Sequence, residues 1–269
     1  MAEPDDGVDN PQRSIERVAE PELRAGPFVA RLARDGNEVR QAQALRYRVL
    51  LRDSGGQPGD EADAVEADID EWDDIASHII VRDTRSDDGL VVGTLRLVSS
   101  RELRPGQSFY TEHAFDVSAL RSRFDHLIEL GRFCVDPETR NGIVLGLIWK
   151  LAAQLIIERE ADALFGCASF AGADVNLHLD ALAFLYRECM APEELNVTPR
   201  IAHVRLSELN LPPAAGSERS VPTLVRGYLK LGARSSDAAI VDAQFNTTFV
   251  CLYADARAMI EGQSILRPR

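Results

Sequence analysis

Charged side chains that could bind or activate a small substrate fall into short motifs in the first half of the chain. The motif E-L-G-R carries an acid and a base three residues apart, and D-I-D-E-W-D places Asp70 and Asp73 at the same spacing. Single arginines in A-L-R-Y and G-T-L-R-L complete the set. The candidates are Glu129 with Arg132, Asp70 with Asp73, Arg46, and Arg96.

Glu129 is the candidate general base, because a well-placed carboxylate can accept a proton from a nucleophile directly or through water. Arg132 follows on the same predicted strand, where residues i and i+3 point to opposite faces. The two side chains therefore meet only if a β-bulge or kink intervenes. An ion-paired structural carboxylate at Glu129 is the alternative interpretation.

Asp70 and Asp73 lie on either side of Trp72 and could hold a cationic group of a substrate, since charge-assisted hydrogen bonds to carboxylates are strong. Arg96 could bind a substrate carboxylate through two parallel hydrogen bonds. A solvated acidic loop and an outward-facing strand arginine are the alternatives. The spacing alone leaves both questions open.

The segment V-D-P-E-T-R-N-G joins a predicted central strand to a long predicted helix. The backbone N–H groups at a helix start suit phosphate, so Arg140 and Gly142 are candidates to bind the phosphate of coenzyme A or of a phosphopantetheine arm. No Ser-His-Asp set is recognisable, because Ser169 lacks the G-x-S-x-G elbow and the five histidines are dispersed. Four scattered cysteines without a C-x-x-C pair predict neither a metal site nor disulfides.

Apolar patterning predicts one α/β domain, a mixed central sheet flanked by helices. Residues 1–27 form a predicted flexible leader, 28–255 the domain and 256–269 a tail, with a long acidic loop over 53–75. We expect strands over 28–33, 77–84, 90–100, 126–136, 163–170, 238–245 and 247–255, and helices over 38–53, 141–160, 174–189 and 222–233. The polar face of the first helix is expected to carry Arg46 and Arg48.

Composition excludes several functional classes. A net charge of -13 argues against nucleic acid as a partner, because phosphate contacts need clustered basic residues. No apolar run reaches the roughly 18–20 residues that span a bilayer, and the first residues lack the pattern of a signal peptide. The predicted localisation is cytoplasmic, with peripheral contact with the inner membrane and the oligomeric state left open.

Nine blocks of the sequence together resemble the bacterial ornithine N-acyltransferases that make lyso-ornithine lipid. The resemblance covers residues 28–255 and rests on ALRYRV, DIDEWD, VVGTLRL, FYTEHAFDVSAL, IELGRFCVDPETR, LIWKLAAQLI, LFGCASFAGAD, VPTLVRGYLKLGA and FNTTFVCLYAD. It implies a GNAT-like acyl-CoA N-acyltransferase fold. It also implies transfer of a 3-hydroxyacyl group from acyl carrier protein to the α-amine of L-ornithine, with a phosphopantetheine thioester as donor and no bound cofactor.

The chain is also similar to the acyl-homoserine-lactone synthases, whose early Arg, D-x-x-D, G-x-x-R-L and E-x-x-R match the charged motifs described above. The resemblance implies catalytic roles for Glu129 and Arg132, and acceptor binding by Arg46, Asp70, Asp73 and Arg96. It places the pantetheine arm between two splayed strands. The residues implied to contact this arm are Cys134, Val135, Arg140, Gly142 and Ser169.

Arg140 is followed by N-G-I-V-L rather than by the phosphate loop usual in GNAT proteins, which favours a carrier protein over free acyl-coenzyme A. Arg121, Arg123, Arg140 and Lys150 are candidates for a basic surface that meets this acidic partner. The alternatives are a homoserine-lactone synthase that uses S-adenosylmethionine, an N-acyltransferase for another amino acid, and an inactive carrier-binding module.

Overall fold

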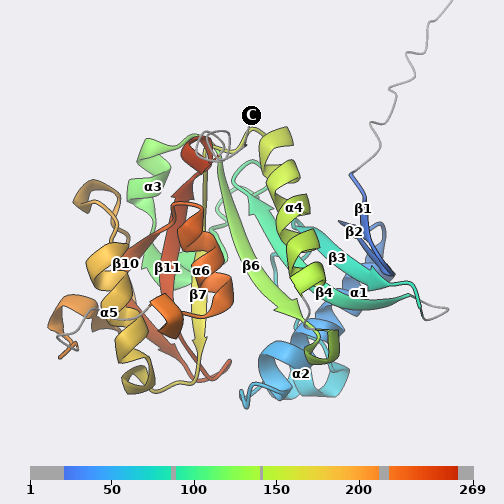
Figure 1. Cartoon of the computed structure of the whole chain (residues 1–269), viewed down its shortest axis with the longest axis horizontal. Helices are drawn as coiled ribbons and strands as arrows, with labels where there is room; N and C mark the ends of the chain where they lie inside the picture. The colour runs from blue at the N-terminus through green and yellow to red at the C-terminus, as the bar shows by residue number, and fades with distance from the viewer. Residues whose placement is uncertain (1–20, 86–88, 140–141, 212–217, 260–269) are drawn as a thin grey trace, which may run out of the picture.

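The computed structural model describes residues 21–85, 89–139, 142–211 and 218–259. A nine-stranded mixed sheet lies at its centre, with α4, α5 and α6 on one face and α1 and α3 on the other (Figure 1). The strand order is β1-β2-β3-β4-β6-β7-β11-β10-β9, and β5 pairs with β8 separately. This is the mixed sheet flanked by helices that the sequence predicts.

The strands of this fold are β1 (Leu23–Ala25), β2 (Phe28–Leu32), β3 (Ser77–Asp83), β4 (Leu90–Ser99), β5 (Phe115–Asp116), β6 (Leu127–Val135), β7 (Ala163–Ala171), β8 (Thr198–Pro199), β9 (Val204–Arg205), β10 (Arg234–Asp242) and β11 (Thr247–Asp255). The α-helices are α1 (Gly36–Arg46), α2 (Asp60–Val65), α3 (Ser118–Arg123), α4 (Gly142–Glu158), α5 (Leu179–Glu188) and α6 (Thr223–Lys230). A π-helix (Tyr47–Arg52) continues α1, and short 3₁₀ turns cover Tyr110–His113, Pro137–Thr139, Val175–His178, Glu193–Leu195, Leu206–Glu208 and Glu218–Ser220.

The sheet is joined at its middle by one short parallel pairing. β6 and β7 pair only from Leu127 opposite Ala163 to Glu129 opposite Phe165, whereas every other neighbouring pair in the sheet is antiparallel. At the point of divergence a Cβ on Gly166 would lie 2.2 Å from the Leu130 carbonyl oxygen. Only glycine lets the two backbones approach so closely before they part.

A β-bulge interrupts β6 directly after the point of divergence. Thr94 pairs with Cys134 and Arg96 with Gly131, so two steps along β4 correspond to three along β6. Arg132 has φ of 54°, a left-handed conformation uncommon outside glycine. The expectation of a bulge in E-L-G-R is confirmed.

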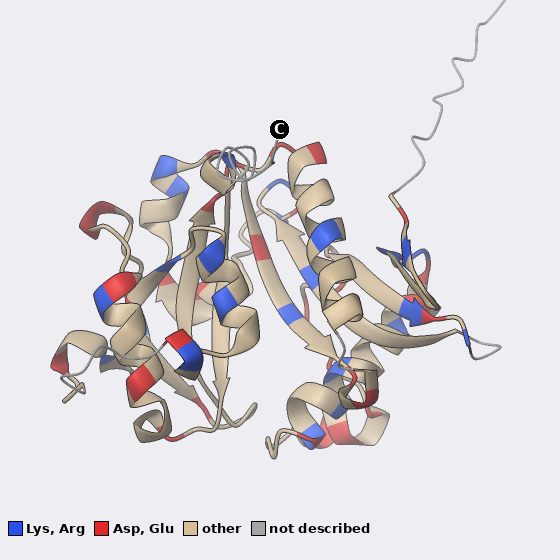
Figure 2. Cartoon of the chain, in the orientation of Figure 1, with Lys and Arg blue, Asp and Glu red and all other residues tan. Residues whose placement is uncertain are grey.

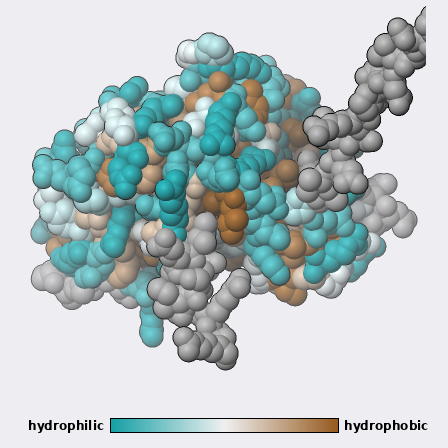
Figure 3. Space-filling view, turned by 90° about the horizontal axis from the view of Figure 1, so that it is seen from above, coloured by the Kyte–Doolittle hydropathy of each residue, from teal (hydrophilic) through white to brown (hydrophobic). Residues whose placement is uncertain are grey.

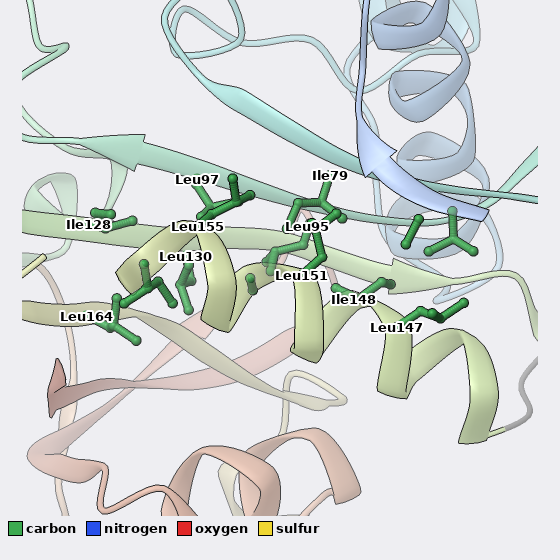
Figure 4. Packing of buried hydrophobic residues seen from close by; sticks show 14 of the residues in the cluster. Ile79, Leu95, Leu97, Ile128, Leu130, Leu147, Ile148, Leu151, Leu155 and Leu164 are labelled. Atoms are coloured by element: carbon green, nitrogen blue, oxygen red, sulfur yellow. The ribbon is translucent and has the colours of Figure 1, made fainter. Parts of the chain in front are cut away.

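The larger apolar core lies between α4 and the strands from β2 to β6. Leu147, Ile148, Leu151 and Leu155 project from α4 onto this side of the sheet (Figure 4). The sequence has apolar residues almost all round this helix and predicts that it is largely buried, but Ile143 and Ile157 are exposed. The reason is that α4 covers one face of the sheet, so only one stripe of its surface meets the core.

Several predicted segments differ in their boundaries. β1 lies within residues 1–27 and pairs with β2, so the sheet begins before Phe28. The acidic stretch 53–75 contains α2, and its second half turns inward around buried Trp72. Ala256, in the predicted tail, is also buried, whereas residues 1–20 and 260–269 lie outside the described residues. No helix in the described part of the chain is long and apolar enough to cross a bilayer.

Candidate active site

A cavity of about 160 Å³ lies where β6 and β7 part. Its lining comes from β4, β6, β7, β10, β11 and the β10–β11 turn, together with the π-helix, the 3₁₀ turn that begins at Tyr110 and one position of α6. The lining residues are Leu50, Arg96, Tyr110, Thr111, Glu129, Leu130, Gly131, Arg132, Phe133, Cys167, Ser169, Tyr228, Asp242, Phe245, Thr247 and Phe249. The cavity is smaller than the roughly 300–1,000 Å³ typical of drug-sized ligands, which suits a small acceptor.

Glu129 is buried at the inner end of this cavity. Its carboxylate accepts hydrogen bonds from the backbone N–H of Tyr110 at 3.1 Å and of Thr111 at 2.6 Å. Burial raises the pKa of Glu129 despite these hydrogen bonds, because desolvation disfavours the charged form. A carboxylate with a raised pKa holds an abstracted proton more firmly, which is the property that a general base needs.

Arg96 and Arg132 bring two positive charges to the same cavity from β4 and from the bulge of β6. Arg96 donates to Asp70 and, at 2.9 Å, to Asp73. Arg132 donates through Nε to Asp68 at 2.7 Å and through Nη2 to Asp70 at 3.0 Å. The bulge thus brings Arg132 and Glu129 into one cavity, although they stand three apart on one strand.

Arg46 lies behind these residues and does not line the cavity. The sequence predicts Arg46 on the polar face of its helix, and its side chain is fully buried there, where it bonds to Asp68 and Asp73. Burial alone would raise the pKa of both carboxyls, but the neighbouring arginine charges outweigh it and lower the pKa. Three arginines and three aspartates thus form a charge-balanced set, which we call the ionic network: Arg46, Arg96, Arg132, Asp68, Asp70 and Asp73.

The structure separates the candidate donor-binding residues. Ser169 lines the cavity from β7. Cys134 is buried against α1 and does not line the cavity, and Val135 packs toward the core beneath α4. Gly142 is exposed at the first position of α4, and Arg140 lies outside the described residues.

An apolar groove of about 440 Å³ lies between α4 and α6. Trp149 and Lys150 border it on α4, and Leu231 borders it after α6. On the end of the molecule nearest the paired ends of β6 and β7, apolar residues surface between hydrophilic areas (Figure 3). Acidic and basic residues are spread over both halves of the chain, with both signs gathered near α2 (Figure 2).

Sequence reasoning did not single out some residues of the site. Asp68 precedes Asp70 by two positions, and the spacing D-x-D-x-x-D was an available signal. Tyr110 and Thr111 contribute backbone groups, which no side-chain motif reveals. Asp242 is the last residue of β10 and belongs to no recognisable motif. Among the described residues, no group of three or more His, Cys, Asp or Glu side chains is arranged to hold a metal ion.

Comparisons with known proteins agree with this geometry. Residues 45–150 match the model of an acetyltransferase (GNAT) domain. An N-acyl amino acid synthase from uncultured soil microbes has the same fold, with a TM-score of 0.50 at 13% identity over 87% of this chain and 93% of that one. The domain match and the fold place the chain in the GNAT class.

Proteins with similar sequences identify the family within this class. The chain is 36% identical to the L-ornithine N(alpha)-acyltransferase of Rhodobacter capsulatus over 87% of its length and 92% of that protein. It is also 36% identical to the protein of that name from Rhizobium meliloti, over 85% of its length and 80% of the relative. The chain belongs to the L-ornithine N(alpha)-acyltransferase family.

Proposed function

We propose that this protein transfers a 3-hydroxyacyl group from acyl carrier protein to the α-amine of L-ornithine. The product is lyso-ornithine lipid, made in the first step of ornithine-lipid synthesis. The observation that carries the proposal is the 36% identity, over most of both chains, to relatives named for acylation of this amine. The cavity supports it, because a buried carboxylate and two arginines meet there where β6 and β7 part.

In the proposed reaction, the neutral α-amine attacks the thioester carbonyl directly. A carbon–nitrogen bond forms and Glu129 takes the amine proton. The carbon–sulfur bond then breaks, and the departing thiolate of the carrier arm receives this proton from Glu129 and leaves as the thiol. Backbone N–H groups at the bulge around Gly131 stabilise the oxyanion. No acyl-enzyme is needed, because an oriented amine already attacks a thioester readily.

Arg96 and Arg132 bind the acceptor's α-carboxylate in this proposal. Both line the cavity, and the aspartates of the ionic network hold their guanidinium groups in place. The sequence analysis proposed that Asp70 and Asp73 bind the cationic end of the acceptor. Because their oxygens accept hydrogen bonds from arginines, we assign them to the positioning of Arg96 and Arg132.

The donor's pantetheine arm lies between β6 and β7 in this proposal, with Ser169 beside it. The apolar groove between α4 and α6 receives the hydrophobic part of the donor, since apolar surface there is otherwise left to solvent. Lys150 is exposed at the edge of this groove and is well placed to meet an acidic carrier protein. The start of α4 at Gly142 is the place for the arm's phosphate.

Expression in a bacterial host that lacks ornithine lipids tests the proposal. Mass spectrometry of the lipid extract should show an ion for an N-(3-hydroxyacyl)ornithine, and cells expressing Glu129→Gln should lack it. Purified protein should consume 3-hydroxyacyl carrier protein in preference to the coenzyme A thioester. Soluble wild-type protein that yields no such lipid would overturn the assignment of ornithine as acceptor.

A further inference from the structure

A second carboxylate lines the cavity outside the ionic network. Glu129 and Asp242 are the two acids that line the cavity among the residues that the structure describes. Glu129 comes from β6 and Asp242 from the last position of β10, and β7 and β11 lie between these strands in the sheet. The two carboxylates therefore border the cavity from different sides.

The contacts of Asp242 leave its charge directed at the cavity. Its Oδ1 accepts one hydrogen bond, from the backbone N–H of Phe245 at 3.1 Å within the β10–β11 turn. Within the described ranges, no lysine or arginine forms an ion pair with it. Its carboxylate is therefore available to a cation that enters the cavity.

The pKa of Cys167 also reflects the charge of Asp242. Cys167 lines the cavity from β7, between the strands that carry the two acids. Burial chiefly raises the pKa of the Cys167 thiol to about 12, and the charges of Glu129 and Asp242 both add to this rise. The charge of Asp242 also raises the pKa of Tyr110, after the larger effect of burial. Both carboxylates thus act on the same enclosed space.

We propose that Asp242 binds the side-chain ammonium of the acceptor and so selects a basic amino acid. The inference rests on the proposed function and adds the residue that recognises the acceptor's side chain. With the α-carboxylate at Arg96 and Arg132 and the α-amine at Glu129, the side chain extends toward the β10–β11 turn. Phe245 and Phe249 line the cavity there and offer apolar surface to the methylene groups.

The test compares two acceptors that differ only in the terminal amine, L-ornithine and L-norvaline. Asp242→Asn removes the charge but keeps an oxygen for the Phe245 N–H, so the turn retains its hydrogen bond. We expect the KM for ornithine to rise about 10- to 100-fold, as for loss of one hydrogen bond to a charged group. kcat for ornithine and kcat/KM for norvaline should stay within about threefold.

Asp180→Asn is the matched control, because Asp180 is exposed on α5 and does not line the cavity. It should leave both acceptors unaffected. An unchanged KM for ornithine in Asp242→Asn would overturn the role of Asp242. The proposed function would still stand in that case, provided that the wild type acylates ornithine. If Asp242→Asn does not fold, the wild type is compared on the two acceptors instead. Equal kcat/KM values for norvaline and ornithine would exclude recognition of the side-chain ammonium. Failure of the wild type to acylate ornithine at all overturns the proposed function instead.

Discussion

Arg46 and Asp73 are joined by two parallel hydrogen bonds of 2.8 Å, where neither side chain is more than 4% exposed. This pair ties the acidic stretch after α2 to the end of α1, 27 residues away in sequence. Gln43 adds a hydrogen bond to the same carboxylate at 2.8 Å. The three aspartates of D-I-D-E-W-D are therefore folded inward as partners for arginine, and they set where Arg96 and Arg132 point.

Replacing Arg46 with methionine should lower the free energy of unfolding by about 3–5 kcal/mol, because buried Asp68 and Asp73 would keep their charges without this partner. Denaturant titration of the purified variant measures the loss. Arg52→Met is the control, since Arg52 is largely exposed and pairs with its neighbour Asp53. It should change stability by less than about 0.5 kcal/mol. Equal stability of both variants would show that the network contributes nothing to the fold.

Glu129→Gln should lower kcat at least about 100-fold, because glutamine cannot accept the amine proton. In the wild type, kcat/KM should fall as the pH drops through the raised pKa of Glu129, where the base becomes protonated. Steady-state rates with a carrier-bound acyl donor provide the measurement, and exposed Glu61→Gln is the matched control. Turnover within about threefold of the wild type, a barrier change of ~0.7 kcal/mol, would exclude the general-base role.

The same substitution should affect stability in a pH-dependent way. The pKa of Glu129 is raised in the folded state, so the folded protein binds this proton more tightly than the unfolded chain. Its contribution to stability is therefore present below the unfolded pKa and is lost as the pH rises through the folded pKa. Relative to the wild type, Glu129→Gln should be more stable at pH 7.5 than at pH 4. Parallel unfolding curves at both pH values would contradict this linkage.

Gly166→Ala should destabilise the protein by about 1–3 kcal/mol and reduce activity, because a methyl group there overlaps the Leu130 carbonyl and forces β6 and β7 apart. Gly146→Ala serves as the control. A Cβ at Gly146, in the middle of α4, would meet no atom within 4 Å. Alanine there should stabilise by roughly 0.5–1 kcal/mol. Thermal unfolding with an activity assay compares the two, and a harmless Gly166→Ala would show that the strand approach is not needed.

Local patterns in the sequence predicted the β3–β4 hairpin, β6, α4 and β7, because each has an apolar periodicity that its neighbours do not alter. They also led to Glu129, Arg96 and Arg132, which line one cavity. The partners of Asp70 and Asp73 were not predictable, because the stretch that carries them lacks periodicity and is placed by contacts with α1.

The side of the sheet that Cys134 faces was not predictable for a different reason. Successive side chains on a strand alternate between faces, so the extra residue at the bulge reverses the alternation for the rest of β6. Asp242 was not predictable either, because β10 follows β6 by nearly a hundred residues and reaches the cavity only through the order of strands in the sheet.

The three residue pairs between β6 and β7 join the two halves of the sheet, and we call them the pivot. Glu129 lies in the last of these pairs, and Arg132 lies just beyond it, where the two halves of the sheet have begun to separate. A small rotation about the pivot would move Arg132 more than it moves Glu129, because displacement grows with distance from the axis. The same short stretch of backbone therefore positions the proposed base and sets the width of the opening that we propose for the thioester.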